Sequence, residues 1–136
     1  MKHIFIGVLL LVSTSITYAE KSFEECNSLW KQMSEMAKCQ MKANETKEKK
    51  IASIIESIKT TFKLKEQINN VIAAQNNWAS YLESECRARM NPIAAGSSNA
   101  AIYQYCRHIK ISNRLKELKS FHYCNDNGCP ERIEQK

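Results

Sequence analysis

Apolar residues recur every three or four positions along the middle of the chain, with polar residues between them. One series comprises Ile51, Ile55, Ile58 and Phe62. A second comprises Leu64, Ile68, Val71, Gln75, Trp78, Leu82 and Cys86, with Gln75 as its polar interruption. Such spacing places the side chains on one face of a helix, and neither Gly nor Pro interrupts residues 20–91. The pattern predicts a long helical arm with one apolar face.

The arm is expected to fold back on itself between Thr60 and Glu66. An unbroken helix from Met33 to Met90 would be about 85 Å long at about 1.5 Å per residue, and much of its apolar stripe would face water. A hairpin buries the two stripes against each other, although the breaking signals around Thr60 are weak. Dimerisation of the arm is the alternative.

A third helix is predicted from about Asn99 to Ser120. Pro92 and the run Gly96-Ser97-Ser98-Asn99 indicate a loop before it, and Asn99 is the expected N-cap. The stripe expected to face the core contains Ile102, Cys106, Ile109, Leu115 and Leu118. The fold class is therefore all-α, an antiparallel helical hairpin or bundle of about three to four helices.

The first residues have the pattern of a secretory signal peptide. A basic start precedes an apolar run over residues 4–12, and small residues near Ala19 favour cleavage after it. The run is shorter than the about 20 residues that span a bilayer, and the residues before Cys26 do not form a lipid-modification signal. We expect a periplasmic or secreted protein without a membrane anchor. Its expected parts are a leader (1–19), a helical domain (20–121) and a tail (122–136).

An even number of cysteines follows the leader, which indicates disulfides in an oxidising compartment. They are Cys26, Cys39, Cys86, Cys106, Cys124 and Cys129. Cys124 and Cys129 flank a tight turn, and a Cys86–Cys106 bridge would lock the second helical connection, with a contribution of about 3 kcal/mol. Cys26 and Cys39 remain. One straight helix would hold them about 20 Å apart, so residues 22–31 must fold back for them to pair.

A metal site and an enzyme are both disfavoured. His122, Cys124 and Cys129 are close in sequence, but zinc takes four ligands at short regular spacings and no Cys-x-x-Cys is present. His108 and His122 have no nucleophile at a recognisable spacing, and there is no Gly-rich phosphate loop. We expect no cofactor and no catalysis.

The mature chain is basic. The sequence has 20 Lys and Arg residues, one of them Lys2 of the leader, against 14 Asp and Glu, so the net charge without the leader is +5. The charges are spread along the chain, which is typical of a solvated surface. They would also attract an acidic partner or envelope surface. The compartment and the lack of a recognition motif disfavour nucleic acid.

Several motifs occur in a fixed order in the second half of the chain. They are Gln75-x-x-Trp78-x-x-Tyr81, Cys86, Gly96-Ser97, Cys106, Arg114 and Glu117-Leu118. This order resembles the LprI-like family of secreted lysozyme-inhibitor-type domains of bacteria. Cys26, Glu35-Met36 and Cys39 agree more loosely with its opening. Departures are Leu82-Glu83 in place of Arg-Asp, Ile111 in place of Thr, and the added tail.

The resemblance implies an all-helical fold, an extracytoplasmic bacterial setting and inhibition of lysozyme. The contact with the enzyme is expected at the loop of Gly96, Ser97 and Ser98, flanked by Arg87, Arg89 and Arg107. The net charge opposes binding to animal c-type lysozymes, which are usually basic. We expect Trp78 and Tyr81 in the helix interface, and a local ion pair between Arg114 and Glu117.

Two other functions are compatible with the sequence. The first is an adaptor that binds another envelope or host component without inhibiting lysozyme, and it predicts exposed aromatic residues on a helical face. The second is a small secreted effector of a eukaryote, in which Asn44-Glu45-Thr46 would accept a glycan. The short leader and the family pattern favour a bacterial protein.

Overall fold

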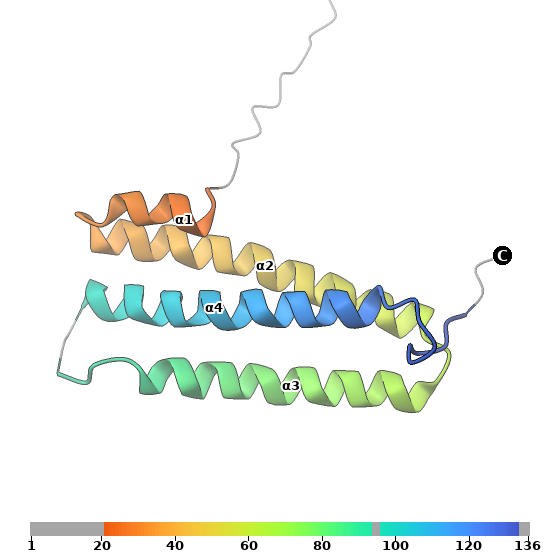
Figure 1. The fold of residues 1–136 in the computed structure, drawn as a ribbon. Helices are drawn as coiled ribbons and strands as arrows, with labels where there is room; N and C mark the ends of the chain where they lie inside the picture. The colour runs from red at the N-terminus through yellow and green to blue at the C-terminus, as the bar shows by residue number, and fades with distance from the viewer. Residues whose placement is uncertain (1–20, 94–95, 134–136) are drawn as a thin grey trace, which may run out of the picture.

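A computed structural model describes residues 21–93 and 96–133 and shows an all-α protein (Figure 1). Its elements are α1 (Phe23–Cys26), the 3-10 helix η1 (Asn27–Leu29), α2 (Met33–Thr61), α3 (Lys65–Ala88) and α4 (Ser97–His122). The three long helices lie side by side, and α3 runs antiparallel to α2 and α4. The predicted fold class and hairpin are confirmed. The predicted leader lies outside the described residues.

The turn between α2 and α3 lies within the predicted interval. Helix α2 ends where Phe62 adopts an extended conformation, and the buried Phe62 ring packs 5.4 Å from that of Phe121. The C-terminal tail pairs with this turn: Lys63 N donates to Glu131 O at 2.9 Å, and Ile133 N donates to Thr61 O at 2.8 Å. Because the tail satisfies these backbone groups, the turn needs no Gly or Pro.

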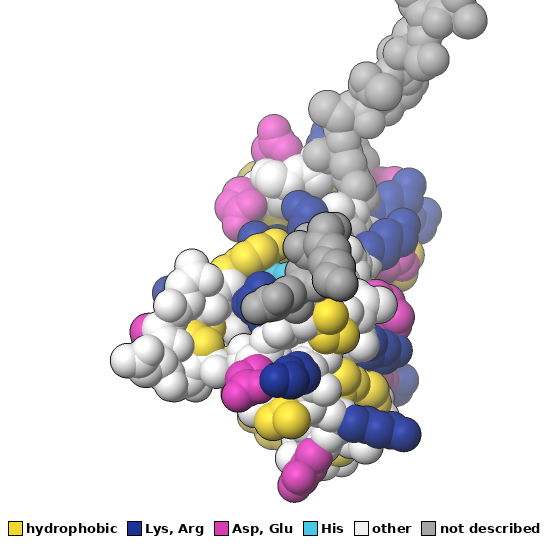
Figure 2. Space-filling view, turned by 90° about the vertical axis from the view of Figure 1, so that its right-hand side faces the viewer, with side chains coloured by type: hydrophobic (Ala, Val, Ile, Leu, Met, Phe, Trp, Pro, Cys, Tyr) yellow, Lys and Arg dark blue, Asp and Glu magenta, His cyan; other side chains and the backbone are white. Residues whose placement is uncertain are grey.

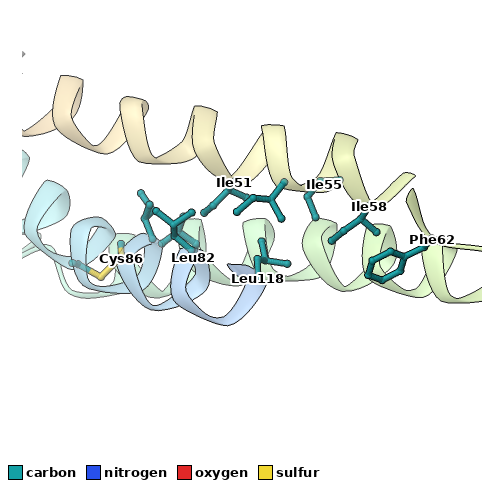
Figure 3. Close-up of a cluster of buried hydrophobic side chains, with 11 residues drawn as sticks. Ile51, Ile55, Ile58, Phe62, Leu82, Cys86 and Leu118 are labelled. Carbon is teal, nitrogen blue, oxygen red and sulfur yellow. A yellow bond between two sulfur atoms is a disulfide. The ribbon is translucent and has the colours of Figure 1, made fainter. Parts of the chain in front are cut away.

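The main core lies chiefly between α2 and α4 (Figure 3). It confirms the first predicted stripe, since Ile51, Ile55, Ile58 and Phe62 are all buried. Burial of one such side chain contributes about 1.5–3 kcal/mol. Two residues of α3 are buried, Leu82 and Cys86, whereas Ile68, Val71 and Trp78 are partly buried. Helix α3 therefore packs on the α2–α4 pair less deeply than they pack on each other.

Three residues predicted for the core are exposed, and these predictions were wrong. Ile102 is 43% exposed, Ile109 is 44% exposed and Leu64 is 48% exposed. Cys106, Leu115 and Leu118 of the predicted stripe are buried, as expected. Helix α4 packs mainly on α2, so the face on the opposite side from Ile102 and Ile109 is turned inward. That face carries Ala101, Gln104, Ile111, Leu115 and Leu118. Leu64 lies in the hairpin turn, outside both helices.

The start of α4 also differs from the prediction. Gly96, and not Asn99, occupies the N-cap position, and the helix begins at Ser97. Asn99 is buried and its side chain bonds across the loop to Asn91. Tertiary contact with the end of α3 thus decides the role of Asn99.

The N-terminal segment folds back along α2, as the pairing of Cys26 with Cys39 predicts. Ser22 starts α1 with a capping box that it forms with Glu25. Phe23 is buried and its ring stacks on His108 of α4, with 3.7 Å between the ring centroids. This short segment therefore joins α2 and α4 at one end of the bundle.

Charged residues of both signs are mixed on the molecular surface. Seen from the end that carries the hairpin turn and the tail, Lys and Arg side chains lie among acidic and apolar ones (Figure 2). No helix within the described part of the chain is long and apolar enough to cross a membrane.

Candidate partner-binding site

The loop between α3 and α4 is closed at its base by two asparagines. Asn91 N donates to Asn99 Oδ1 at 3.0 Å, and Asn99 Nδ2 donates to Asn91 O at 2.8 Å. The disulfide between Cys86 and Cys106 joins the two helices behind this pair, with 5.5 Å between the Cα atoms. The loop is therefore held on a rigid base.

Gly96, Ser97 and Ser98 lie together where the loop enters α4. Gly96 has a φ of 100°, a conformation that favours glycine, although the space around a Cβ there is open. Ser97 is exposed and Ser98 is partly exposed. The N-cap residue of α4 is Gly96, which has no side chain that could accept a hydrogen bond from the first turn. Two hydroxyl groups and the first-turn N–H groups of α4 are thus concentrated at this end of the bundle.

The three arginines predicted to flank the loop lie in different places. Arg87 lines a shallow pocket of about 340 Å³ with Gly96 and Tyr103, so it is next to the loop. Arg89 pairs with Glu85 and borders a different pocket. Arg107, about one turn after Tyr103 on α4, pairs with Glu48 of α2. The structure brings only Arg87 of these three to the pocket that contains Gly96.

Arg87 belongs to a small polar network behind the loop. The carboxylate of Glu83 accepts hydrogen bonds from Tyr103 and Arg87. The bond from Tyr103, with the help of Arg87, lowers the pKa of Glu83, while burial and the bond to Glu83 raise the pKa of Tyr103. Arg107 also donates to the Tyr103 hydroxyl at 3.3 Å. The positive charge of Arg87 is therefore largely balanced within the protein.

The motif residues on α3 and α4 fasten these helices together. Arg114 Nε donates to Gln75 Oε1 at 3.0 Å, and its guanidinium lies 5.9 Å from the centre of the Trp78 ring. The predicted ion pair of Arg114 with Glu117 is present at 3.3 Å, and Leu118 is buried in the core. These contacts give the motif a structural role.

Tyr81 differs from the other aromatic residue of the motif. It is 51% exposed, although the sequence pattern placed it in the helix interface. Its hydroxyl accepts a hydrogen bond from Lys110 Nζ at 2.7 Å, and the same ammonium group lies 4.6 Å from the ring centre. Tyr81 thus forms part of the outer surface of the α3–α4 pair.

A buried amide pair between α2 and α4 was not predicted from the sequence. Asn44 is 1% exposed, and its Nδ2 donates to Gln104 O at 2.9 Å and to Gln104 Oε1 at 3.0 Å. Apolar periodicity does not indicate that a polar residue is buried, so the contact between Asn44 and Gln104 could not be recognised in the sequence. In the folded protein Asn44 is not available to carry a glycan.

All six cysteines are paired, with the predicted connectivity. Cys124, Cys129 and Asp126 lie close enough to suggest a metal site. The two sulfur atoms are bonded to each other, however, so they are not thiolate ligands. Three disulfides are typical of an extracytoplasmic protein.

Similarity to known proteins is found at the level of a protein family. No curated protein and no solved structure matches the chain. A family model described as lysozyme inhibitor LprI matches residues 25–118, which include the first two disulfides and the Gly96 loop. Two departures noted in the sequence, Leu82 and Ile111, are buried core residues. Because the match covers most of the chain and the helical motif residues within it pack together, the chain belongs to the LprI lysozyme-inhibitor family.

Proposed function

We propose that this protein is a periplasmic or secreted binding protein that inhibits a lysozyme through the loop end of its bundle. Membership of the LprI family is the observation that carries the proposal. The three disulfides support an extracytoplasmic setting. In this proposal residues 20–121 form the binding domain, and the tail (122–136) stabilises the opposite end.

The chemistry of the loop suits a glycosidase cleft. Lysozymes cleave their substrate with two carboxyl groups, so an inhibitor needs hydrogen-bond donors on a protruding support. Ser97 and Ser98 offer hydroxyl groups, and the N-terminus of α4 offers backbone N–H groups and the positive end of a helix dipole. The rigid loop base reduces the entropy lost on binding.

The net charge of the protein restricts the class of enzyme. With the leader removed, the charge of +5 would repel a strongly basic lysozyme at long range. Tight binding to such an enzyme would depend on the short-range contacts of the loop. A lysozyme with a less basic surface is therefore the better target.

The test is a lysis assay with Ser97→Glu. The oxidised protein is incubated with lysozymes of several types, and clearing of a cell-wall suspension is followed. A carboxylate at the first position of α4 stabilises the helix but would meet the carboxylates of the enzyme. We expect the wild-type protein to slow lysis and Ser97→Glu to lose at least tenfold in potency.

Ser53→Glu is the matched control, because Ser53 is exposed on α2, away from the loop. It should inhibit as well as the wild-type protein. Undiminished lysis by every lysozyme at a large molar excess of the wild-type protein would contradict the proposal. Equal potency of Ser97→Glu and wild type would contradict the loop as the contact.

The adaptor function remains the second candidate. It predicts exposed aromatic residues on a helical face, and Tyr81 and Tyr105 are 51% and 55% exposed. These two residues lie on α3 and α4, away from the tip of the loop.

A further inference from the structure

We propose that the outer face of α4 is a second binding surface, which takes an amphipathic helix with acidic flanks from a protein partner. The surface consists of Ile102, Tyr105 and Ile109, with Arg89 and Lys110 at its margin. It does not depend on inhibition of lysozyme through the Gly96 loop.

The apolar part of this surface has helical spacing. Ile102, Tyr105 and Ile109 lie three and four residues apart, so they form one stripe over two turns of α4. They are 43%, 55% and 44% exposed, although their pattern is that of a buried face. A contiguous exposed apolar stripe is typical of an interaction site.

The stripe lies in a hollow and not on a convex surface. With Cys106, Arg89, Lys110 and Asn113 it lines a pocket of about 530 Å³. Arg89 comes from the end of α3. The Phe23 ring of α1 lies 6.2 Å from that of Tyr105, but Phe23 is buried and does not line this pocket. The hollow between α4 and the end of α3 can accommodate apolar side chains from one face of a helix.

The charges at the margin select the partner. Arg89 Nη2 lies 2.6 Å from Glu85 Oε1, and Lys110 Nζ lies 3.9 Å from the same oxygen. Two cations thus share one carboxylate, which leaves the margin positively charged. A partner helix with Glu or Asp beside its apolar stripe would supply the missing negative charge, whereas a basic protein would be repelled.

Synthetic helical peptides provide the probe. One carries Leu at heptad positions a and d and Glu at e and g, and the control peptide has the same apolar face with Lys at e and g. Binding is measured by calorimetry at low salt, and the binding site is mapped by NMR amide shifts on the full mature protein. We expect the Glu peptide to bind and to shift amides of residues 102–110, with weaker binding at high salt.

Two variants and a control test the assignment. The double variant Ile102→Ser, Ile109→Ser should bind the Glu peptide at least tenfold more weakly, and Lys110→Glu should weaken the Glu peptide while strengthening the Lys peptide. Leu64→Ser is the control, since Leu64 is 48% exposed but lies at the α2–α3 turn. Circular dichroism and disulfide mapping establish that each variant is folded, and lysis assays should show unchanged inhibition.

Four results would overturn the proposal. The Glu peptide does not bind, or the folded double variant binds it as tightly as the wild-type protein does. Alternatively, phosphatidylglycerol vesicles bind through this face while the peptide does not. Finally, the wild-type protein dimerises and Ile109→Ser makes it monomeric, which would show that a second copy covers the stripe.

Discussion

At the scale of single residues, polar side chains inside the bundle set the pairing of α2 with α4. Asn44 and Gln104 form a buried amide pair, and Lys47 Nζ donates to Ser112 Oγ at 2.9 Å. A buried amide without its partner costs about 1–3 kcal/mol. A shift of one helix along the other would break these bonds, so they specify the register more sharply than apolar contacts can.

His108 makes the stability of the fold depend on pH. It is packed under Phe23, with Lys47 Nζ 3.4 Å from Nδ1 and Glu24 Oε1 3.5 Å from Nε2. Burial, followed by the charge of Lys47, lowers the pKa of His108, while Glu24 opposes this effect. Burial and the charge of Arg132 also lower the pKa of His122.

A lowered histidine pKa means that the unfolded chain binds the proton more readily. The free energy of unfolding should therefore fall as the pH drops below about 6.5, the ordinary pKa of the histidine side chain. Urea denaturation at pH 8 and pH 5.5 measures this change. His108→Phe keeps the ring against Phe23 and should reduce the loss at pH 5.5. An identical loss in this variant would show that His108 does not contribute.

At the scale of elements, two of the three disulfides fasten a segment that is too short or too exposed to hold its position alone, whereas Cys86–Cys106 joins two long helices. Helix α1 has four residues, far fewer than an isolated helix needs in water. The Cys26–Cys39 bond attaches it to α2. The Cys124–Cys129 bond closes the turn before the segment that pairs with residues 61–63.

Replacing Cys26 and Cys39 together by Ser should destabilise the protein by about 3 kcal/mol and release α1 from α4. Chemical denaturation measures the first effect, and the NMR shifts of the Phe23 ring protons measure the second. The Cys124–Cys129 bond closes a shorter loop, so the matched variant with both of these cysteines replaced by Ser should lose only about 2 kcal/mol. Unchanged Phe23 shifts in the first variant would mean that packing alone holds α1.

At the scale of the whole molecule, the bundle is a closely packed pair of parallel helices with a third helix attached. Contacts between α2 and α4 extend along the bundle, from Asn44 with Gln104 to Ser57 with His122. Helix α3 is anchored mainly from its middle to its C-terminus, by the Gln75–Arg114 bond and by the buried Leu82 and Cys86. The N-terminal half of α3 buries less of its surface.

Hydrogen exchange should reveal this difference. We expect the amides of Ile55 and Ile111 to exchange only on global unfolding, because both residues lie in the core. The amide of Val71, in the less buried half of α3, should exchange at least tenfold faster. Equal protection of all three amides would show that the bundle opens as one unit.

The sequence by itself determined the helical class, the hairpin, the disulfide pairing and most of the core of α2. Each of these follows from local periodicity or from the short reach of a disulfide. Tertiary structure alone decided the face of α4 that is buried, because Ile102, Ile109 and Ile111 have similar side chains and only the packing against α2 distinguishes them. It also decided the roles of Asn99 and Asn44, since a buried polar contact depends on a partner that is distant in sequence and leaves no periodic signal.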